Sequence, residues 1–375
     1  MKILFISMPS IHAIRWIENL SSKSFELYWF DILDRGKLDT NIEIKQFVGW
    51  KKRKVKYIRG EFWLSKNMPS FYSLIEPFLV TNKNEALESI IKNISPDIIH
   101  SFEMHHCTYP ILKTMNKFPL IKWVYSSWGS DLFYYKDTSP QKEAIRKSLE
   151  RIDFFHSDNK RDFIIAKENG YHKGKFSVIP GGGGYDIEKY TKYSSLQSSR
   201  KVILVKGYEH KFGRALNVVK ALANIKSKIK EFEVIVFGAH PKVISYIKQN
   251  NLTFKYYERN ELTQNEVLKL MGKSKIYIGN SISDGMPNTL LEALIMGVFP
   301  IQSNPGNVTA EIIEDKVNGL LINDPEDVKE ISNTILFALH NDQLIQEGNR
   351  INKEIVNDKL GYKKNQKKII DLYKL

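Results

Sequence analysis

Short apolar runs alternate with amphipathic stretches along nearly the whole chain, and this alternation restricts the fold more than any other feature. A first series of runs predicts strands at residues 2–6, 26–30, 97–101, 122–127 and 175–179. A second series predicts strands at residues 202–205, 233–237, 254–257, 276–279 and 298–302. Helical periodicity fills the intervals, as in Ile11, Ile14, Ile17 and Leu20. Such alternation is typical of α/β folds with parallel sheets covered on both faces, so two series predict two doubly wound domains.

The 375 residues are enough for two domains of ordinary size. We place an N-terminal Rossmann-like domain at residues 1–190 and a C-terminal Rossmann-like domain at residues 191–360. The polar stretch 186–200 is the candidate linker. Ligands of open α/β sheets bind outside the carboxyl ends of the strands. The site is therefore expected in a cleft between two facing sheets, with its residues at strand ends.

The formal net charge of +14 favours a polyanionic partner, which nucleic acid, anionic lipid or a phosphorylated substrate would each satisfy. The single cysteine excludes an internal disulfide and favours a reducing compartment. The apolar run after Met1 is too short for a signal peptide, and no apolar stretch is long enough to predict a membrane span. We therefore expect a cytoplasmic location.

The segment 281–322 carries two carboxylates around a predicted helix start. Asp284 lies in a loop rich in glycine and proline, and Glu292 follows inside an apolar helical pattern. Proline fits the first turn of a helix, a glycine before it allows close approach, and the exposed amides of such a start attract phosphate. A nucleotide diphosphate could rest there without a metal. The residues predicted to border it are Gly285, Met286, Pro287 and Asn288.

This segment resembles the donor-binding segment of retaining GT-B glycosyltransferases, in particular glycosyltransferase family 4, the group 1 glycosyltransferases. The family pattern is E-G-x-P-x4-E, and Asp284 stands in place of the first glutamate. The resemblance implies two Rossmann-like domains facing across a cleft, with a closing helix at residues 361–375 that returns to the first domain. It also implies that Glu292 accepts hydrogen bonds from ribose hydroxyls and that Asp284 holds a hydroxyl of the donor sugar.

Three basic residues follow the first strand of the second domain: Lys206, Lys211 and Arg214. Members of the family usually have an arginine and a lysine in this loop that contact the donor phosphates, although the usual spacing is not reproduced here. Fixed cations would stabilise the charge that builds on a leaving diphosphate, and losing one such contact typically costs ~3 kcal/mol. Together with Asp284, we assign Arg214 and Lys211 to catalysis. By resemblance, the loop at Glu258 contacts the base. The alternative for these lysines is a solvated basic loop.

The predicted acceptor side lies in the first domain. His12 and Arg15 come near a helix start, in an opening similar to that of a subset of the family. His100 lies on a family-like strand, and the stretch from Trp128 to Asp131 resembles the family's H-G-S-D strand end, with Trp128 in place of the histidine. The alternatives are a helix-start role for His12, core packing for His100 and helix capping for Asp131.

No metal or other cofactor is predicted, since the nucleotide sugar is a co-substrate. His100, His105 and His106 cluster in sequence, but no second group of ligands accompanies them, and no D-x-D motif stands at a strand end. The four glycines at residues 181–184 are interpreted as a hinge, because no G-K-[ST] follows them to make a phosphate-binding loop.

Basic and aromatic residues interleave at residues 49–64. Nucleic-acid-binding proteins have such segments, as do proteins that lie on anionic membranes, and a solvated charged loop is the third interpretation. Given the other motifs, we favour the inner face of a membrane that carries a lipid-linked acceptor, and expect no nucleic acid.

The leading hypothesis is a retaining, metal-independent glycosyltransferase that moves a sugar from a nucleotide-sugar donor to a glycan or lipid-linked glycan, in surface polysaccharide or glycoconjugate biosynthesis. A nucleotide-sugar epimerase of GT-B fold and a basic nucleic-acid-binding protein are the alternatives. A hydrolase would need Asp284 and Glu292 to flank the scissile bond as an acid and nucleophile pair.

Overall fold

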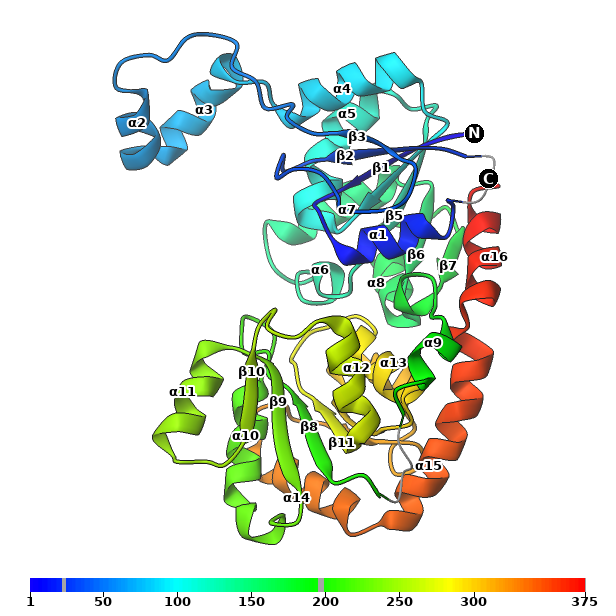
Figure 1. Ribbon diagram of the computed structural model, residues 1–375. Helices are drawn as coiled ribbons and strands as arrows, with labels where there is room; N and C mark the ends of the chain where they lie inside the picture. The colour runs from blue at the N-terminus through cyan, green and yellow to red at the C-terminus, as the bar shows by residue number, and fades with distance from the viewer. Residues whose placement is uncertain (22–24, 195–198, 375) are drawn as a thin grey trace. The chain divides into compact units, whose positions relative to one another are not determined.

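The computed structural model describes residues 1–21, 25–194 and 199–374, and forms two compact units (Figure 1). Unit 1 comprises Met1–Ser157, Phe163–Ser177 and Ile369–Leu375, and unit 2 comprises Asp158–Asp162 and Val178–Lys368. The sequence analysis placed a boundary at 190/191; residues 178–190 cluster with unit 2. The central residues of the predicted linker, 195–198, lie outside the described residues, and the helix α9 (Ile187–Thr191) occupies its first part.

Unit 1 contains a sheet of seven strands in the order β3-β2-β1-β4-β5-β6-β7, and each pairing from β3 to β6 is parallel. The strands are β1 (Lys2–Ser7), β2 (Glu26–Asp31), β3 (Lys45–Phe47), β4 (Ile98–Phe102), β5 (Lys122–Ser126), β6 (Phe154–Ser157) and β7 (Phe176–Val178). The α-helices that begin in this part of the chain are α1 (Ile11–Glu18), α2 (Glu61–Asn67), α3 (Pro69–Leu79), α4 (Lys83–Ile94), α5 (Leu112–Lys117), α6 (Ser130–Phe133), α7 (Gln141–Arg151) and α8 (Lys160–Glu168).

The core of unit 1 forms because its central strands are apolar on both sides. Leu4 and Ile6 of β1, Ile99 of β4 and Trp123 of β5 are fully buried in one cluster. The last turn of α16 (Tyr362–Leu372) and the residues after it complete this unit, since Tyr373 is fully buried and packs edge-on against Phe5 of β1.

Unit 2 contains a parallel sheet of six strands in the order β10-β9-β8-β11-β12-β13. The strands are β8 (Val202–Lys206), β9 (Glu233–Ala239), β10 (Lys255–Glu258), β11 (Ser274–Gly279), β12 (Phe299–Ser303) and β13 (Leu320–Ile322). Besides α9, the α-helices here are α10 (Ala215–Asn224), α11 (Pro241–Gln249), α12 (Gln264–Lys273), α13 (Asn288–Ile295), α14 (Val328–Leu339) and α15 (Asp342–Ile355).

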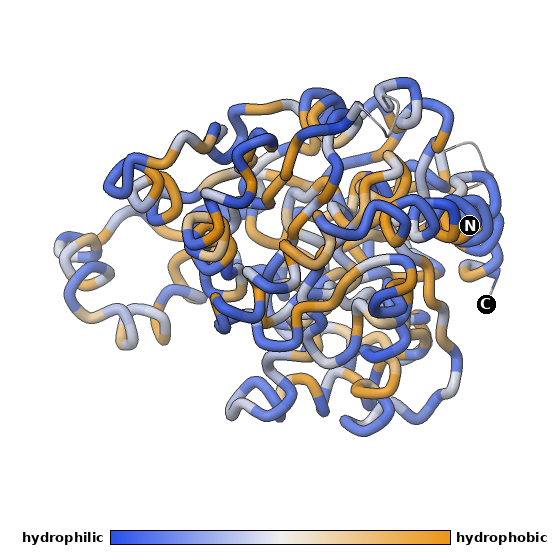
Figure 2. Tube along the Cα trace, turned by 90° about the horizontal axis from the view of Figure 1, so that it is seen from below, coloured by the Kyte–Doolittle hydropathy of each residue, from blue (hydrophilic) through white to orange (hydrophobic). Residues whose placement is uncertain are grey.

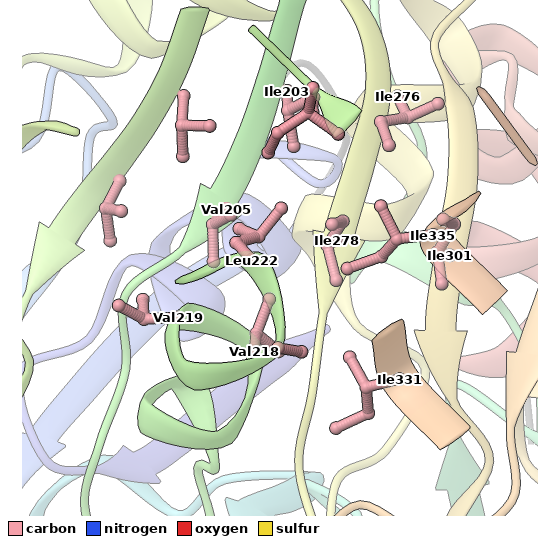
Figure 3. Packing of buried hydrophobic residues seen from close by; sticks show 14 of the residues in the cluster. Ile203, Val205, Val218, Val219, Leu222, Ile276, Ile278, Ile301, Ile331 and Ile335 are labelled. Atoms are coloured by element: carbon pink, nitrogen blue, oxygen red, sulfur yellow. The ribbon is translucent and has the colours of Figure 1, made fainter. Parts of the chain in front are cut away.

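Apolar side chains alternate between the two faces of the sheet in unit 2. On one face Ile203 and Val205 of β8 and Ile278 of β11 pack with the apolar sides of α10 and α14 (Figure 3). On the other face Leu204 and Tyr277 pack with the leucines of α13. Along the trace, hydrophobic and hydrophilic stretches alternate, as expected for helices with one buried side (Figure 2). The prediction of two doubly wound α/β units is confirmed.

All ten predicted strands are present, with ends shifted by one or two residues. The strands β3, β6 and β13 were not predicted from the sequence. The four glycines at residues 181–184 all have positive φ, the backbone region for which glycine is best suited. Among the described residues, no helix is both long enough and apolar enough to cross a membrane.

Candidate functional site

The order of the strands in unit 2 determines where a ligand can bind. The chain reverses direction across the sheet between the neighbouring strands β8 and β11, and ligands of such sheets bind outside the carboxyl ends of the strands at this point. Lys206 is the last residue of β8, and the loop that contains Asp284 follows β11 and leads into α13. Residues predicted from two distant sequence segments therefore meet at one edge of one sheet.

The start of α13 has the features of an anion site. Pro287 is the N-cap residue in an extended conformation, and its side chain makes no capping hydrogen bond. The amides of the first turn of a helix attract negative charge when no cap occupies them. Just before the helix, the Gly285 N–H donates to Asp284 Oδ1 at 3.0 Å. The Asp284 carboxylate therefore lies beside the backbone that leads into α13.

Asp284 is partly buried at this edge. Burial raises the pKa of its carboxyl, while the positive charges of Lys206, Arg161 and His210 and the amide of Gly285 act in the opposite direction. A carboxylate beside a lysine suits the recognition of a sugar hydroxyl next to a phosphate. That role for Asp284 and the phosphate role for Lys206 remain predictions.

Glu292 lies on the second turn of α13 and is only 7% exposed. Its neighbours Leu290, Leu291 and Leu294 are buried, so the prediction that this helix is buried is confirmed. Glu292 Oε1 accepts a hydrogen bond of 2.7 Å from Nε2 of Gln264, the first residue of α12. A buried carboxylate has two oxygens that can accept hydrogen bonds from hydroxyl groups. Its contact with a ribose remains a prediction.

The loop between β8 and α10 contains Lys211 and Arg214. Lys211 is exposed. The Arg214 guanidinium donates from Nε to Glu326 at 2.8 Å and from Nη1 to the carbonyl oxygen of Gly213 at 2.9 Å, and the Arg214 backbone N–H donates to the carbonyl oxygen of Asn280. In this arrangement Arg214 braces the loop against β11. Phosphate contacts from Arg214 and Lys211 remain predictions.

A group of aromatic rings at the ends of β8 and β9 was missed by the sequence analysis. The ring of His240 lies 5.4 Å from that of Tyr208 and 5.6 Å from that of His210. Lys206 Nζ lies 4.8 Å from the centre of the Tyr208 ring, and Arg259 Cζ lies 5.7 Å from it. Burial, followed by the charge of His240, lowers the pKa of His210. Flat rings flanked by cations are suited to a nucleotide.

Glu258, predicted near the base, ends β10 and is exposed.

A short segment far from α13 in sequence also holds the Asp284 loop, and no motif indicated it. Asp158 Oδ1 accepts a hydrogen bond of 3.1 Å from the Met286 N–H. Arg161 Nη2 donates to the backbone oxygen of Asp284 at 2.7 Å, and Nη1 donates to that of Pro305 at 2.8 Å. Burial, reinforced by the charge of Asp162, raises the pKa of Asp158 to about 7. These contacts lie within unit 2.

In unit 1 the corresponding reversal lies between β1 and β4. Ser10 is the N-cap of α1, and its hydroxyl accepts a hydrogen bond from the His12 N–H at 3.2 Å. His12 is exposed, and its ring lies 5.7 Å from that of Trp128, which follows β5. Arg15 is partly buried on the same helix. The structure therefore brings His12 and Trp128 together at this edge.

His100 and Asp131 are buried and hold other parts of unit 1 in place. His100 pairs with Ser126 Oγ at 2.7 Å and with Tyr373 Oη, and burial holds its pKa well below the usual value. Asp131 accepts hydrogen bonds from the backbone N–H groups of Met104 and Trp128, both at 2.8 Å. His100 thus has the packing role that was one alternative to acceptor binding, whereas Asp131 lies inside α6, whose N-cap is Gly129, and joins that helix to Met104.

The part of the chain that the structure describes contains no group of three or more His, Cys, Asp or Glu side chains that could hold a metal ion. His105 Nε2 pairs with the backbone oxygen of Asp131 at 2.9 Å, and His106 Nδ1 pairs with Glu103 at 3.2 Å.

Comparison with protein families gives two matches that together span most of the chain. Residues 186–357 match Glycosyl transferases group 1, and residues 2–159 match Glycosyl transferase 4-like. The chain belongs to the group 1 glycosyltransferases. The GT-B fold predicted for this glycosyltransferase is confirmed by its two parallel sheets and by the solved structures that it resembles.

Three of these structures show how far the similarity extends. HepE from Anabaena, in complex with UDP, is 14% identical over 100% of both chains, with a TM-score of 0.73. Sucrose-phosphate synthase from Thermosynechococcus elongatus is 14% identical over 100% of this chain and 98% of its own, with a TM-score of 0.72. A glycosyltransferase from Rickettsia africae is 15% identical over 100% of this chain and 97% of its own, with a TM-score of 0.68. Among curated proteins, none matches this glycosyltransferase.

Proposed function

We propose that this glycosyltransferase moves a sugar from a nucleotide-sugar donor to an acceptor hydroxyl, with retention of anomeric configuration and without a metal. The observation that carries the proposal is the convergence of Lys206, the Asp284 loop and the start of α13 at the point where the sheet order of unit 2 reverses. HepE has been solved in complexes with UDP and with UDP-glucose, which supports a uridine diphosphate sugar as the donor here.

The proposed roles follow from the chemistry of each group. The diphosphate lies on the first amides of α13 and beside Lys206, with Lys211 and Arg214 nearby in sequence. Negative charge grows on the diphosphate as the glycosidic bond breaks, and fixed cations and amides stabilise it without reorganising. Asp284 holds a hydroxyl of the sugar, and Glu292 holds the ribose. The departing phosphate receives the acceptor proton on the face that it leaves, which gives retention.

The proposed acceptor is a glycan or lipid-linked glycan, with the chain on the inner, cytoplasmic face of an anionic membrane. In unit 1, the exposed ring of His12 beside Trp128 is the feature that supports an acceptor surface. Aromatic rings commonly pack against the apolar faces of ligands, and an imidazole can donate or accept hydrogen bonds. We further propose a role in surface polysaccharide or glycoconjugate biosynthesis, with no nucleic acid as partner.

Calorimetric titration with UDP-, GDP- and ADP-sugars tests the donor assignment. Glu292→Ala should weaken binding of the preferred donor about tenfold, because the ribose loses hydrogen bonds to a carboxylate. Glu347→Ala, on the surface of α15, is the matched control and should change nothing. Unchanged donor affinity in the Glu292 variant would remove its assigned role.

Turnover tests the remaining parts of the proposal. Transfer should continue in excess EDTA, and the anomeric configuration of the product, read by NMR, should match that of the donor. Complete loss in EDTA with recovery on adding a divalent ion would contradict the metal-free mechanism. Release of an epimerised sugar in the absence of any acceptor would support the epimerase instead.

A further inference from the structure

The helices α2 and α3 form a hairpin that projects from the rest of unit 1 (Figure 1). Many of its large apolar side chains point to solvent: Phe62 is 81% exposed, Phe78 is 75% exposed and Leu74 is 68% exposed. Tyr57, Trp63 and Phe71 are also exposed. Contiguous apolar surface of this kind marks a site of interaction, whereas scattered apolar residues do not.

The orientation of α3 is the reverse of that of a helix in a globular core. Phe71, Leu74 and Phe78 follow the spacing i, i+3, i+7, so they share one helical face, and this face is exposed. The inward side of α3 carries Leu79, which is buried, and Tyr72, whose hydroxyl donates to Glu61 Oε1 at 2.9 Å. The large apolar side chains on this face therefore remain exposed among the described residues of unit 1.

A buried polar cluster fixes the hairpin in this orientation. Glu61 is 7% exposed, and Arg53 donates to both of its carboxylate oxygens, at 2.7 and 2.8 Å. The hydrogen bond from Arg53 lowers the pKa of Glu61 to about 2, so this pair stays charged at physiological pH. Bidentate pairs of this kind impose a defined geometry. An ion pair beneath the helices and large exposed apolar side chains on their outer side are the arrangement expected for an element whose outer surroundings are lipid.

The charges of the hairpin indicate which surface it meets. Residues 51–80 contain seven lysines and arginines but only two glutamates. Lys51 pairs with Glu76 at 3.0 Å, and Lys54 pairs with Glu85 at 2.6 Å. Four further cations are exposed and form no ion pair with a carboxylate of the described residues. They are Lys52, Lys56, Arg59 and Lys66.

We propose that the α2–α3 hairpin docks onto a lipid bilayer that contains anionic phospholipid. Its aromatic side chains enter the boundary between headgroups and acyl chains, and the four exposed cations contact headgroup phosphates. A second copy of the chain is a poorer occupant, because a symmetric contact would bring two strongly basic hairpins together. That this bilayer carries the acceptor rests on the proposed function. Binding of the hairpin to the bilayer can be measured without any sugar transfer.

Vesicle binding with the full chain tests the proposal. The wild type should sediment with vesicles of phosphatidylcholine and phosphatidylglycerol, and much less with phosphatidylcholine alone. Brominated phospholipid should quench the fluorescence of Trp63. Subtracting the fluorescence of the Trp63→Phe variant from that of the wild type gives the contribution of Trp63 apart from the other tryptophans. Absence of vesicle binding, or no quenching of Trp63, overturns the proposal.

Two sets of variants identify the surface. Serine at Phe71, Leu74 and Phe78 should abolish binding, whereas serine at the exposed residues Leu120, Ile164 and Phe337 should not. Serine in place of the four exposed cations should weaken binding about fivefold per cation at low salt. The matched control is serine at exposed lysines elsewhere in unit 1, namely Lys113, Lys122, Lys142 and Lys175.

The donor assay separates this inference from the proposed function. Thermal stabilisation by a UDP-sugar should be the same in the hairpin variants and in the wild type. If the hairpin variants bind both the donor and the vesicles as the wild type does, the docking proposal is wrong and the proposed function stands. If the apolar variants instead convert a dimer to a monomer in sedimentation, with vesicle binding unchanged, the face is an interface between copies and the proposal is wrong.

Discussion

Three carboxyl groups come close together behind the donor loop: those of Asp158, Asp162 and Asp284. Arg161 is the cation at their centre, since its guanidinium contacts Asp162 and the backbone oxygen of Asp284. Lys206 and Arg161 offset the charge of Asp284, but Asp158 is poorly solvated and lies near both other carboxyl groups, so an excess of negative charge there carries a large penalty. Protonation of Asp158, whose pKa is raised to about 7, relieves the excess. The Met286 amide, which donates to Asp158 Oδ1, favours the charged carboxylate and offsets part of this effect.

This proton predicts a dependence of stability on pH. The folded chain keeps Asp158 protonated up to about pH 7, whereas an unfolded aspartate loses its proton near pH 4. Between these values the native state binds more protons, so the free energy of unfolding falls as pH rises, by up to ~1.4 kcal/mol per unit from this group. Asp158→Asn mimics the protonated form and should flatten the profile. Urea denaturation at pH 5, 6, 7 and 8 measures the difference, and parallel profiles would contradict the assignment.

Some residues of the candidate site could be identified from the sequence and others could not. Asp284 and Glu292 were recognisable because a short spaced pattern carries them, and both lie where the pattern predicts. Asp158 and Arg161 were not, because they meet the Asp284 loop only through the tertiary fold and belong to no motif of their own. His100 was selected for its position at a strand end, but burial beside Tyr373 decides its role.

At the scale of elements, the long apolar strands were all predicted, and the three strands that were not predicted are short or partly polar. The runs that became β1, β8 and β11 are continuous and β-branched, a pattern typical of strands buried on both faces. The missed strands differ in kind. β3 and β13 have three residues each at a sheet edge, and β6 contains a histidine and a serine that are buried by neighbours the local sequence does not reveal.

The loop that leads into α13 gives the prediction at this scale. A Cβ atom at Gly285 would lie 2.9 Å from both carboxylate oxygens of Asp158, closer than side chains tolerate. Gly285→Ala should therefore displace the loop and its amides and raise the dissociation constant for the donor about tenfold, within the usual cost of overpacking. Gly361→Ala is the matched control, since its nearest contact would be an ordinary 3.9 Å. Equal donor affinity in calorimetry of both variants would show that the loop absorbs the methyl group.

At the scale of the whole molecule, the chain begins and ends in the same unit. The returning C-terminal helix was predicted from the family resemblance, and Ile369–Leu375 clusters with unit 1 although most of α16 belongs to unit 2. Unit 1 is therefore built from segments that are far apart in sequence, and its core is complete only once the last residues have docked. Tyr373 is the principal contact, because its hydroxyl accepts a hydrogen bond of 2.7 Å from Trp16 Nε1 and also pairs with His100.

Removing one oxygen tests this closure. Tyr373→Phe keeps the ring but leaves the Trp16 and His100 nitrogens without their partner, which should lower the free energy of unfolding of unit 1 by about 2–3 kcal/mol. Tyr57→Phe, at a position 83% exposed, should cost less than about 0.5 kcal/mol. All six tryptophans lie within residues 1–157, so tryptophan fluorescence during urea denaturation reports unit 1 alone. If the two variants unfold at the same urea concentration, the C-terminal segment does not stabilise unit 1 through this hydroxyl. If only Tyr373→Phe unfolds at a lower urea concentration, the last residues stabilise unit 1 through it.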